Sequence, residues 1–483
     1  MKRVLPAVLA FFGIACITAA IAVPAWLVPQ LRVVPLDLDI TSDATTVATD
    51  GSPGERFPAV IFDRCSVGEA KAQTFGAHLT QQRRSVIIEP SDSRQATVQS
   101  AQTVQIDRTR TADGEEVTPP GPNTSGDLTC ASGLLTATID RVSLNRKTSV
   151  PNGTVSSLQL EAAPEGVDPK DVSVQLTNRK GFQYKFGFDV QQRSYLYYDT
   201  NTRQDTEAKF VGEETIKGVK TYHFVTEVPE TDLSSLPNPQ NEAALGTMLT
   251  MPAKWWGITG TGVKPNDSIN MHRYATATRH VWVEPATGTI VDGREDQHQY
   301  FRSPDQSEDT AQPIRDFRLD ALKATFKWSD ETVTQQAARA DKYYGQLRLG
   351  GFWLPLILGI VGVLLVLAWL FLFWRGRSAR SGEPGDDEPL DGDAYAAGAD
   401  TEGVAADESA TEVVERPDAP TVAEPAAGAP TVVLGKSPAP AVGDGAATDD
   451  GYMWDRPTQR IPKVDGPAPR TDGDFGPVDR PER

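Results

Sequence analysis

The chain has 483 residues and a formal net charge of −18, from 65 acidic and 47 basic residues. The excess acid lies at the C-terminal end: residues 381–483 contain 23 Asp and Glu against 8 Lys and Arg, which leaves 42 and 39 for residues 1–380. Because no basic face is available to neutralise phosphate groups, the composition excludes a nucleic-acid-binding protein.

An uncharged segment at residues 4–28 follows the short N-terminus, residues 1–3. Its 25 residues exceed the roughly 20 that cross the hydrocarbon core of a bilayer, so they predict a first transmembrane helix. The alternative is a cleaved signal peptide, since residues 20–22 (AIA) match the A-x-A pattern of a cleavage site. The apolar run up to Ala22 is 19 residues, longer than the usual signal-peptide core of about 7–15, which favours a retained anchor.

Residues 29–328 have the periodicity of a β-rich domain, expected to be an antiparallel curved sheet or a sandwich. Residues 181–189 alternate strictly, which predicts a strand with one aromatic and one polar face. The aromatic face consists of Phe182, Tyr184, Phe186 and Phe188. Strand-like composition also marks residues 96–107, 134–148, 193–199 and 208–216.

Two β-hairpins are predicted in this region. Lys217 and Gly218 join the strand at 208–216 to the one that follows, and a glycine in the second turn position suits a positive φ. Residues 279–295 form the second hairpin, in which Pro285 starts the turn and Gly288 is placed to accept a left-handed conformation.

The β-rich region contains two cysteines, Cys65 and Cys130, while the remaining one, Cys16, lies in the first membrane segment. An oxidising compartment permits a disulfide between Cys65 and Cys130, which would stabilise the fold by about 4 kcal/mol. Two separate buried thiols are the alternative. Two cysteines do not make a zinc site, and we expect neither a metal nor a cofactor.

Two helices are predicted in and after the β-rich region. Residues 241–251 are expected to form a short helix between two prolines. Residues 329–349 are expected to form an amphipathic stalk helix. Its apolar stripe, which either packs on the β-rich domain or contacts a second copy of the chain, consists of Val333, Ala337, Ala340, Tyr344 and Leu347.

Residues 350–374 form a second uncharged segment of 25 residues and predict a second transmembrane helix. Lys2 and Arg3 precede the first membrane segment, and Arg375, Arg377 and Arg380 follow the second. The positive-inside bias therefore places both termini in the cytoplasm. The predicted location is the plasma membrane, with two spans and residues 29–349 outside the cytoplasm.

Residues 375–483 are rich in Ala, Pro, Gly and acidic residues, which predicts a disordered cytoplasmic tail. Thr421 and Thr431 lie in two copies of the sequence APTV. Their phosphorylation would create a site for a cytoplasmic phosphopeptide-binding partner.

No catalytic site is predicted, and we expect the chain not to be an enzyme. His223 lies in an alternating strand without a nucleophile signature or a zinc-binding histidine pair, so a structural role without a recognised partner is expected. Trp255 and Trp256 are adjacent in a loop flanked by Gly and Pro. They would line an apolar pocket, anchor at a membrane interface, or pack on the sheet.

Four internal stretches resemble an actinobacterial cell-envelope family of porin PorA-like proteins, formerly a domain of unknown function. They are residues 24–41 (PAWLVPQLRVVPLDLDIT), 193–202 (RSYLYYDTNT), 218–229 (GVKTYHFVTEVP) and 282–295 (WVEPATGTIVDGRE). The closing membrane helix is similar too, so the resemblance covers about residues 1–375. It implies a porin-like protein of the cell envelope and carries over no catalytic residue.

The residue patterns favour a non-enzymatic envelope membrane protein whose extracytoplasmic domain binds a lipid or another envelope component. Pore formation, by oligomerising membrane helices or by the β-domain itself, is the first alternative. It ranks second because an outer-membrane β-barrel crosses the bilayer with strands and has no long apolar helix. The second alternative is an envelope scaffold or signalling protein that acts through its cytoplasmic tail. The predicted ligand-binding side chains are Phe182, Tyr184, Phe186, Phe188, Trp255 and Trp256.

Overall fold

The computed structural model describes residues 4–110, 113–121, 130–160, 168, 171–239 and 243–378. These residues belong to one compact unit, residues 1–387. Of the predicted tail, the structure describes residues 375–378 as the end of a helix. Thr421 and Thr431 lie outside the described residues.

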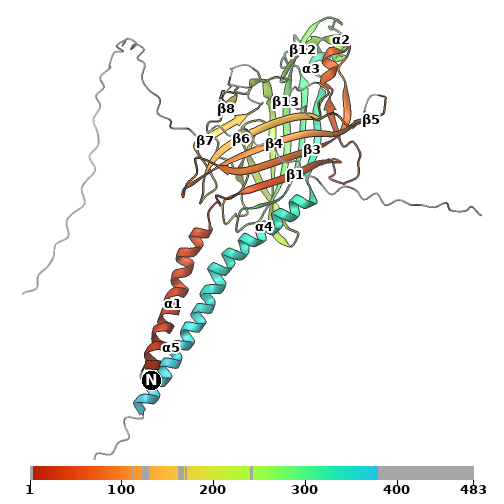
Figure 1. The fold of residues 1–483 in the computed structure, drawn as a ribbon. Coiled ribbons are helices and arrows are strands. Elements are labelled where there is room, and N and C mark those ends of the chain that lie inside the picture. Colours follow the sequence, from red (N-terminus) through yellow and green to blue (C-terminus); the bar gives the residue numbers. More distant parts are fainter. Residues whose placement is uncertain are drawn as a thin grey trace, which may run out of the picture. The chain divides into compact units, whose positions relative to one another are not determined.

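The helices of the described residues include three long ones (Figure 1). These are α1 Val4–Leu31, α4 Asp330–Arg348 and α5 Leu354–Ser378, with a π-helical turn, Leu349–Trp353, between α4 and α5. The short ones are η1 Arg64–Gly68, η2 Leu233–Ser235, α2 Ala253–Trp256 and α3 Gln312–Arg315. Both α1 and the segment containing α5 are long and apolar enough to cross a membrane.

The strands of the described residues number fifteen and form one sheet in which every strand pair is antiparallel. The first eight are β1 Asp39–Val47, β2 Ala59–Phe62, β3 Thr74–Ile88, β4 Gln95–Arg110, β5 Glu116–Val117, β6 Leu134–Asn145, β7 Pro151–Gln159 and β8 Ser173–Gln175. The others are β9 Tyr195–Asp199, β10 Gln204–Ile216, β11 Val219–Asp232, β12 Met248–Pro252, β13 Ser268–Val283, β14 Ile290–Arg302 and β15 Leu319–Trp328. The main order is β8-β7-β6-β4-β3-β1-β15-β14-β13-β11-β10-β9. The expected fold class, a mainly antiparallel β domain between two apolar helices, is confirmed.

Both predicted hairpins are present, and their glycines explain where the chain turns. Between β10 and β11, Lys217 has a φ of 47° and Gly218 a φ of 84°, so both turn residues are left-handed. Between β13 and β14, Gly288 has a φ of 71°. A side chain at Gly288 would also collide with the backbone of Phe186 and Gly187, so only glycine fits there.

The prediction of a strand at residues 181–189 is wrong. Apart from a single bridge between Phe182 and Tyr197, the segment has no ladder partner. Its backbone instead bonds two different elements: Phe182 N donates to Leu196 O of β9, and Phe186 N donates to Gly288 O of the β13–β14 turn. The alternation of side chains reflects burial against two surfaces and not the pleat of a strand.

The predicted helix at residues 241–251 is also wrong. Residues 248–252 form β12, which pairs with β13 from Met248 opposite His272 to Pro252 opposite Ser268. Thr250 and Met251 suit a strand, and pairing with the long strand β13 satisfies backbone groups that a three-turn helix would leave unbonded at its ends. A short helix, α2, follows this strand.

The predicted stalk helix corresponds to α4, which Ser329 caps through a bond from Thr332 N to its Oγ. Val333, Ala337 and Ala340 are buried, and the two alanines pack with Val291 of β14. The first half of the apolar stripe therefore packs on the β domain. Tyr344, further along, is 41% exposed, and the helix continues through the π-helical turn toward α5.

The sheet has two different faces. The inner face carries the apolar core, in two clusters that Trp328 joins: one around Leu79 and Phe326, the other around Phe186 and Phe224. The outer face carries exposed charged side chains on β3, β10 and β15, namely Arg84, Glu207, Lys209, Lys323 and Lys327. This alternation is that of a sheet with one buried face and one face toward water.

Candidate functional site

The helices α1 and α5 pack against each other in antiparallel directions (Figure 1). Gly13 near the start of α1 meets Val366, and Gly350 just before α5 meets Leu27 near the end of α1. A Cβ added to Gly13 would lie 3.2 Å from the carbonyl oxygen of Gly362 and 2.8 Å from Val366 Cγ2. The two helix backbones are thus in direct contact, which is how small residues allow helices to associate in a membrane.

The outward surface of this helix pair is apolar and uncovered. In the most apolar stretch of 18 residues of each segment, only 6% is buried inside the structure. Large exposed side chains include Phe11 at 68%, Ile21 at 70%, Phe371 at 64% and Trp374 at 71%. A surface of this size in contact with water would aggregate, so lipid or another copy of the chain must cover it.

A pair of introduced cysteines tests the packing of α1 on α5. A Cβ built on Gly359 would lie 3.9 Å from the Cβ of Ala20, within the range for a disulfide. In a Cys16→Ser background, the full-length chain carrying Ala20→Cys and Gly359→Cys is expected to form an intramolecular disulfide in membranes after mild oxidation. The bond is read from the mobility shift on a non-reducing gel.

The matched control is Ile21→Cys with Gly359→Cys, because Ile21 is 70% exposed and faces away from α5. This pair should stay reduced. Equal crosslinking of both pairs, or of neither, would contradict the packing seen here. Absence of the peptide that carries the Ala20→Cys substitution from the mature chain would mean that α1 is removed.

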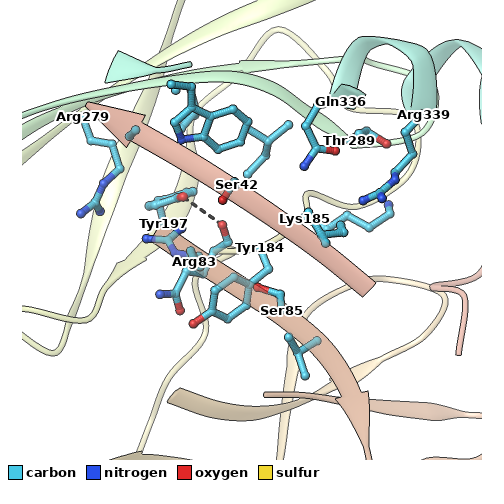
Figure 2. A pocket seen from close by; sticks show the side chains of 18 of the residues that line it. Ser42, Arg83, Ser85, Tyr184, Lys185, Tyr197, Arg279, Thr289, Gln336 and Arg339 are labelled. Carbon is cyan, nitrogen blue, oxygen red and sulfur yellow. Dashed lines mark hydrogen bonds between the residues drawn. The ribbon is translucent and has the colours of Figure 1, made fainter. Parts of the chain in front are cut away.

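A cavity of about 110 Å³ lies on the inner face of the sheet (Figure 2). Its lining includes Val34 and Leu38, which follow α1, and Gln336 and Arg339 of α4, which leads to α5. The cavity therefore lies where both membrane segments join the β domain. Tyr184 and Lys185 line it from the segment that crosses between β8 and β9.

Two arginines on the inner face, Arg179 and Arg279, are held in ion pairs. Arg179 Nη1 and Nη2 donate to the two carboxylate oxygens of Asp140 at 2.8 Å each, and the hydroxyl of Tyr184 donates to the same carboxylate at 2.5 Å. Arg279 donates to Asp199 at 3.0 Å and to Glu295 at 2.6 Å. Burial alone would lower the pKa of Arg279, but these two carboxylates raise it above its usual range.

The six predicted ligand-binding residues are not brought together. Phe182 and Phe186 stack with ring centroids 5.1 Å apart within the core around Phe224. Phe188 lies under the ammonium of Lys185. Of the six, Tyr184 lines the inner cavity.

Trp255 and Trp256 pack in the core beside η1, β12 and β13. Each is 2% exposed, and their indole N–H groups donate to Ser66 O at 3.0 Å and to Ile269 O at 3.3 Å. The two tryptophans thus pack against the sheet, which was one of the three alternatives that the sequence left open. The apolar residues Ile258 and Ile269, which belong to the same core cluster, are the sequence feature that could have favoured packing.

His223 has partners that sequence reasoning missed. Its Nε2 lies 3.0 Å from Nδ1 of His280, its Nδ1 lies 3.2 Å from Glu214, and its ring stacks on Trp282 at 4.3 Å. Burial lowers the pKa of His223, although Glu214 opposes the shift. His280 and Trp282 are neighbours of His223 across the β11–β13 ladder, a register that the sequence does not display.

One Ser, His and Asp cluster lacks the geometry of a catalytic triad. Ser234 Oγ and Asp232 Oδ2 both contact Nδ1 of His272, at 2.9 and 2.7 Å, whereas a triad needs the serine on Nε2. Asp232 also caps η2 by accepting from Ser234 N, so the cluster is explained by that turn. Among the described residues, no three His, Cys, Asp or Glu side chains converge in a way that could hold a metal ion.

The comparison with known families covers the two apolar helices and the β domain between them. The family model described as Porin PorA matches residues 5–371. This chain belongs to the Porin PorA family. The resemblance seen in its sequence is thus confirmed, and the PorA-family chain is a membrane protein.

Two curated relatives cover most of this PorA-family chain. Porin PorA of Corynebacterium amycolatum is 30% identical over 407 residues, which span 76% of this chain and 97% of the relative. Porin PorA of Corynebacterium resistens is 29% identical over 436 residues, which span 78% of this chain and 98% of the relative. The residues that the family model matches, 5–371, include nearly all of α1, the β domain and most of α5.

The prediction that the PorA-family domain serves to bind a lipid or envelope component is wrong. Relatives that align over nearly their whole length carry the name porin, which supports the first alternative, pore formation. Four of the aromatic residues that suggested a lipid site, Phe182, Phe186, Trp255 and Trp256, lie in or against core clusters.

Proposed function

We propose that this chain forms a pore in the cell envelope and has no catalytic role. The observation that carries the proposal is the uncovered apolar surface of the α1–α5 pair in a chain of the Porin PorA family. The relatives are named porins, which supports pore formation, and the helix pair is apolar enough to enter a bilayer. Neither the Ser234 cluster nor a metal-binding group among the described residues offers competing chemistry.

The helices, and not the sheet, are the part proposed to cross the membrane. Charged residues such as Lys209 and Lys323 lie exposed on the outer face of the sheet, whereas a membrane barrel presents an apolar band there. The inner face is filled by core side chains and by ion pairs such as Arg179 with Asp140. Two helices cannot enclose an aqueous path, so we propose that several copies of the pair surround the pore.

The proposed topology places the β domain outside the cytoplasm. Lys2 and Arg3 precede α1 in the sequence, and Arg375, near the end of α5, lies at the same end of the antiparallel pair as the start of α1, so basic residues are expected at one membrane surface. The disulfide between Cys65 and Cys130 suits an oxidising compartment on the opposite side. The close contact of α1 with α5 supports a retained α1 over a cleaved signal peptide.

Planar-bilayer recording of the purified full-length chain tests the pore. Stepwise conductance increments are expected, and they should be lost in Gly362→Leu, because a side chain there would run into Ile17 and the backbone of Gly13. Gly359→Ala is the control, since its added Cβ meets nothing closer than 3.9 Å. The proposal would be overturned by silent bilayers with protein whose α1–α5 packing the engineered crosslink has verified.

A further inference from the structure

We propose that the inner cavity is a binding site for a small monocarboxylate, held by Lys185 and Arg339. The site lies in the β domain and is independent of pore formation. Figure 2 shows Lys185, Arg339, Gln336 and Thr289 at one end of the cavity, with Arg279 at the other. Lys185 comes from the segment crossing between β8 and β9, and Arg339 from α4, so the two cations reach the cavity from different elements.

Lys185 is an ammonium group without a carboxylate partner. Its Nζ donates to the carbonyl oxygens of Phe186, at 3.0 Å, and Thr287, and lies 3.8 Å from the centre of the Phe188 ring, so one of its three protons has no hydrogen-bond acceptor. No ion pair within 4.0 Å involves Lys185 in the described part of the chain. Burial lowers the pKa of Lys185 to about 7, and the nearby Glu284 only partly opposes the shift. A buried ammonium without a carboxylate partner is stabilised when an anion binds beside it.

Two further polar groups of α4 at this cavity have unused bonding capacity. Arg339 Nη1 is buried and has no hydrogen-bond partner among the described residues, while its Nη2 donates to Asp39 O at 3.3 Å. Gln336 is 6% exposed and its Oε1 likewise lacks a partner there. Figure 2 shows both side chains directed from α4 toward the cavity. Turning the Gln336 amide would present its N–H₂ group to an anion.

The other charged groups around the cavity are already engaged. Arg83 donates to Gln102, Arg279 pairs with Asp199 and Glu295, Arg294 contacts Asp296, and His280 contacts His223. Near Lys185, Glu284 accepts from the backbone and hydroxyl of Thr287. Near Arg339, Asp39 is held by Arg84 at 2.8 Å. Arg83, Lys185 and Arg339 are thus the lining cations without an ion pair among the described residues, although the charge of Arg339 still acts on Asp39; of the three, Lys185 and Arg339 lie together at one end of the cavity.

The rest of the lining sets the kind of anion. Apolar side chains of the segment after α1 and of the sheet form most of it: Val34, Pro35, Leu38, Ile40, Ile290 and Phe326. The volume of about 110 Å³ is of the same order as the roughly 150 Å³ cavity that holds benzene, which has as many heavy atoms as butyrate. A carboxylate with a short alkyl chain, of the size of butyrate, fits both the two cations and the apolar wall.

Calorimetric titration of the full-length protein in detergent with butyrate is the test. Butyrate should bind, and butylammonium, which has the same shape and the opposite charge, should not. Lys185→Met and Arg339→Met should each weaken binding by at least about 10-fold, as expected for loss of a charged hydrogen-bond donor. Lys209→Met, which replaces an exposed lysine on the outer face, should leave the affinity unchanged.

The pH dependence of butyrate binding supplies a second measurement. Binding requires the protonated form of Lys185, so affinity should fall at least about 10-fold between about pH 6 and about pH 8.5, and not fall in Lys185→Met. Binding that is equal in all variants, or equal for butylammonium, overturns the proposal. Chloride or phosphate binding as tightly as butyrate through the same residues overturns the assignment to a carboxylate.

Discussion

Replacing Cys65 and Cys130 by alanine is expected to lower the free energy of unfolding of the β domain by about 4 kcal/mol. The two residues form a disulfide across 65 positions of sequence, with their Cα atoms 4.9 Å apart. The bridge connects η1 to the segment that precedes β6. Without it, the unfolded chain gains the conformational freedom of that loop, while the folded sheet keeps its ladders.

The loss can be measured by urea unfolding of the full-length protein in detergent, followed by tryptophan fluorescence. Trp255 reports on this region because its indole donates to Ser66 O, one residue from Cys65. Cys16→Ala, which removes the thiol in α1, is the control and should leave the midpoint unchanged. A midpoint equal to wild type in the double alanine variant would show that the bridge does not constrain the unfolded chain.

Arg179→Met is expected to lower the free energy of unfolding by about 3–5 kcal/mol, because it leaves a buried carboxylate without its partner. The side chains of Arg179 and Asp140 are 2% and 4% exposed. Burial would lower the pKa of Arg179, but the charge and hydrogen bonds of Asp140 raise it well above its usual range. After the substitution, Tyr184 remains as a single donor to that carboxylate.

Arg84→Met supplies the matched comparison, since Arg84 also makes a bidentate pair, with Asp39, but both side chains are 53% exposed. Its cost should not exceed about 1 kcal/mol. The double variant Arg179→Met with Asp140→Leu should recover part of the loss, because it removes the unpaired charge. Similar unfolding midpoints for Arg179→Met and Arg84→Met would mean that burial adds nothing to the inner pair.

The membrane segments and the hairpins could be predicted from the sequence because local properties decide them. A 25-residue uncharged run has few soluble alternatives, and a Lys-Gly pair between two alternating segments favours a tight turn. The same local reasoning failed at residues 181–189 and 241–251. There, the backbone partners lie in β9, the β13–β14 turn and β13, and no periodicity within the segment shows which element satisfies its hydrogen bonds.

The functional hypothesis drawn from residue patterns failed for a related reason. Phe182, Phe186, Trp255 and Trp256 were predicted to bind a ligand, with packing on the sheet as an open alternative for the two tryptophans, whereas in the structure all four lie in or against core clusters. The family resemblance was the better guide, because its four stretches and the closing membrane helix together span about residues 1–375. Pore formation ranked second because an outer-membrane barrel has no long apolar helix, although a pore built from oligomerising helices was already one of the alternatives.

The sequence by itself determined the two apolar helices, the β-rich region between them, the pairing candidates Cys65 and Cys130, and membership of the Porin PorA family. Only the tertiary structure decided that Gly13 meets Gly362 and that Lys185 and Arg339 line one cavity. The members of each pair lie more than a hundred positions apart in the sequence. Such contacts follow from strand register and helix packing. Both depend on the whole fold, so the local sequence around each residue does not reveal them.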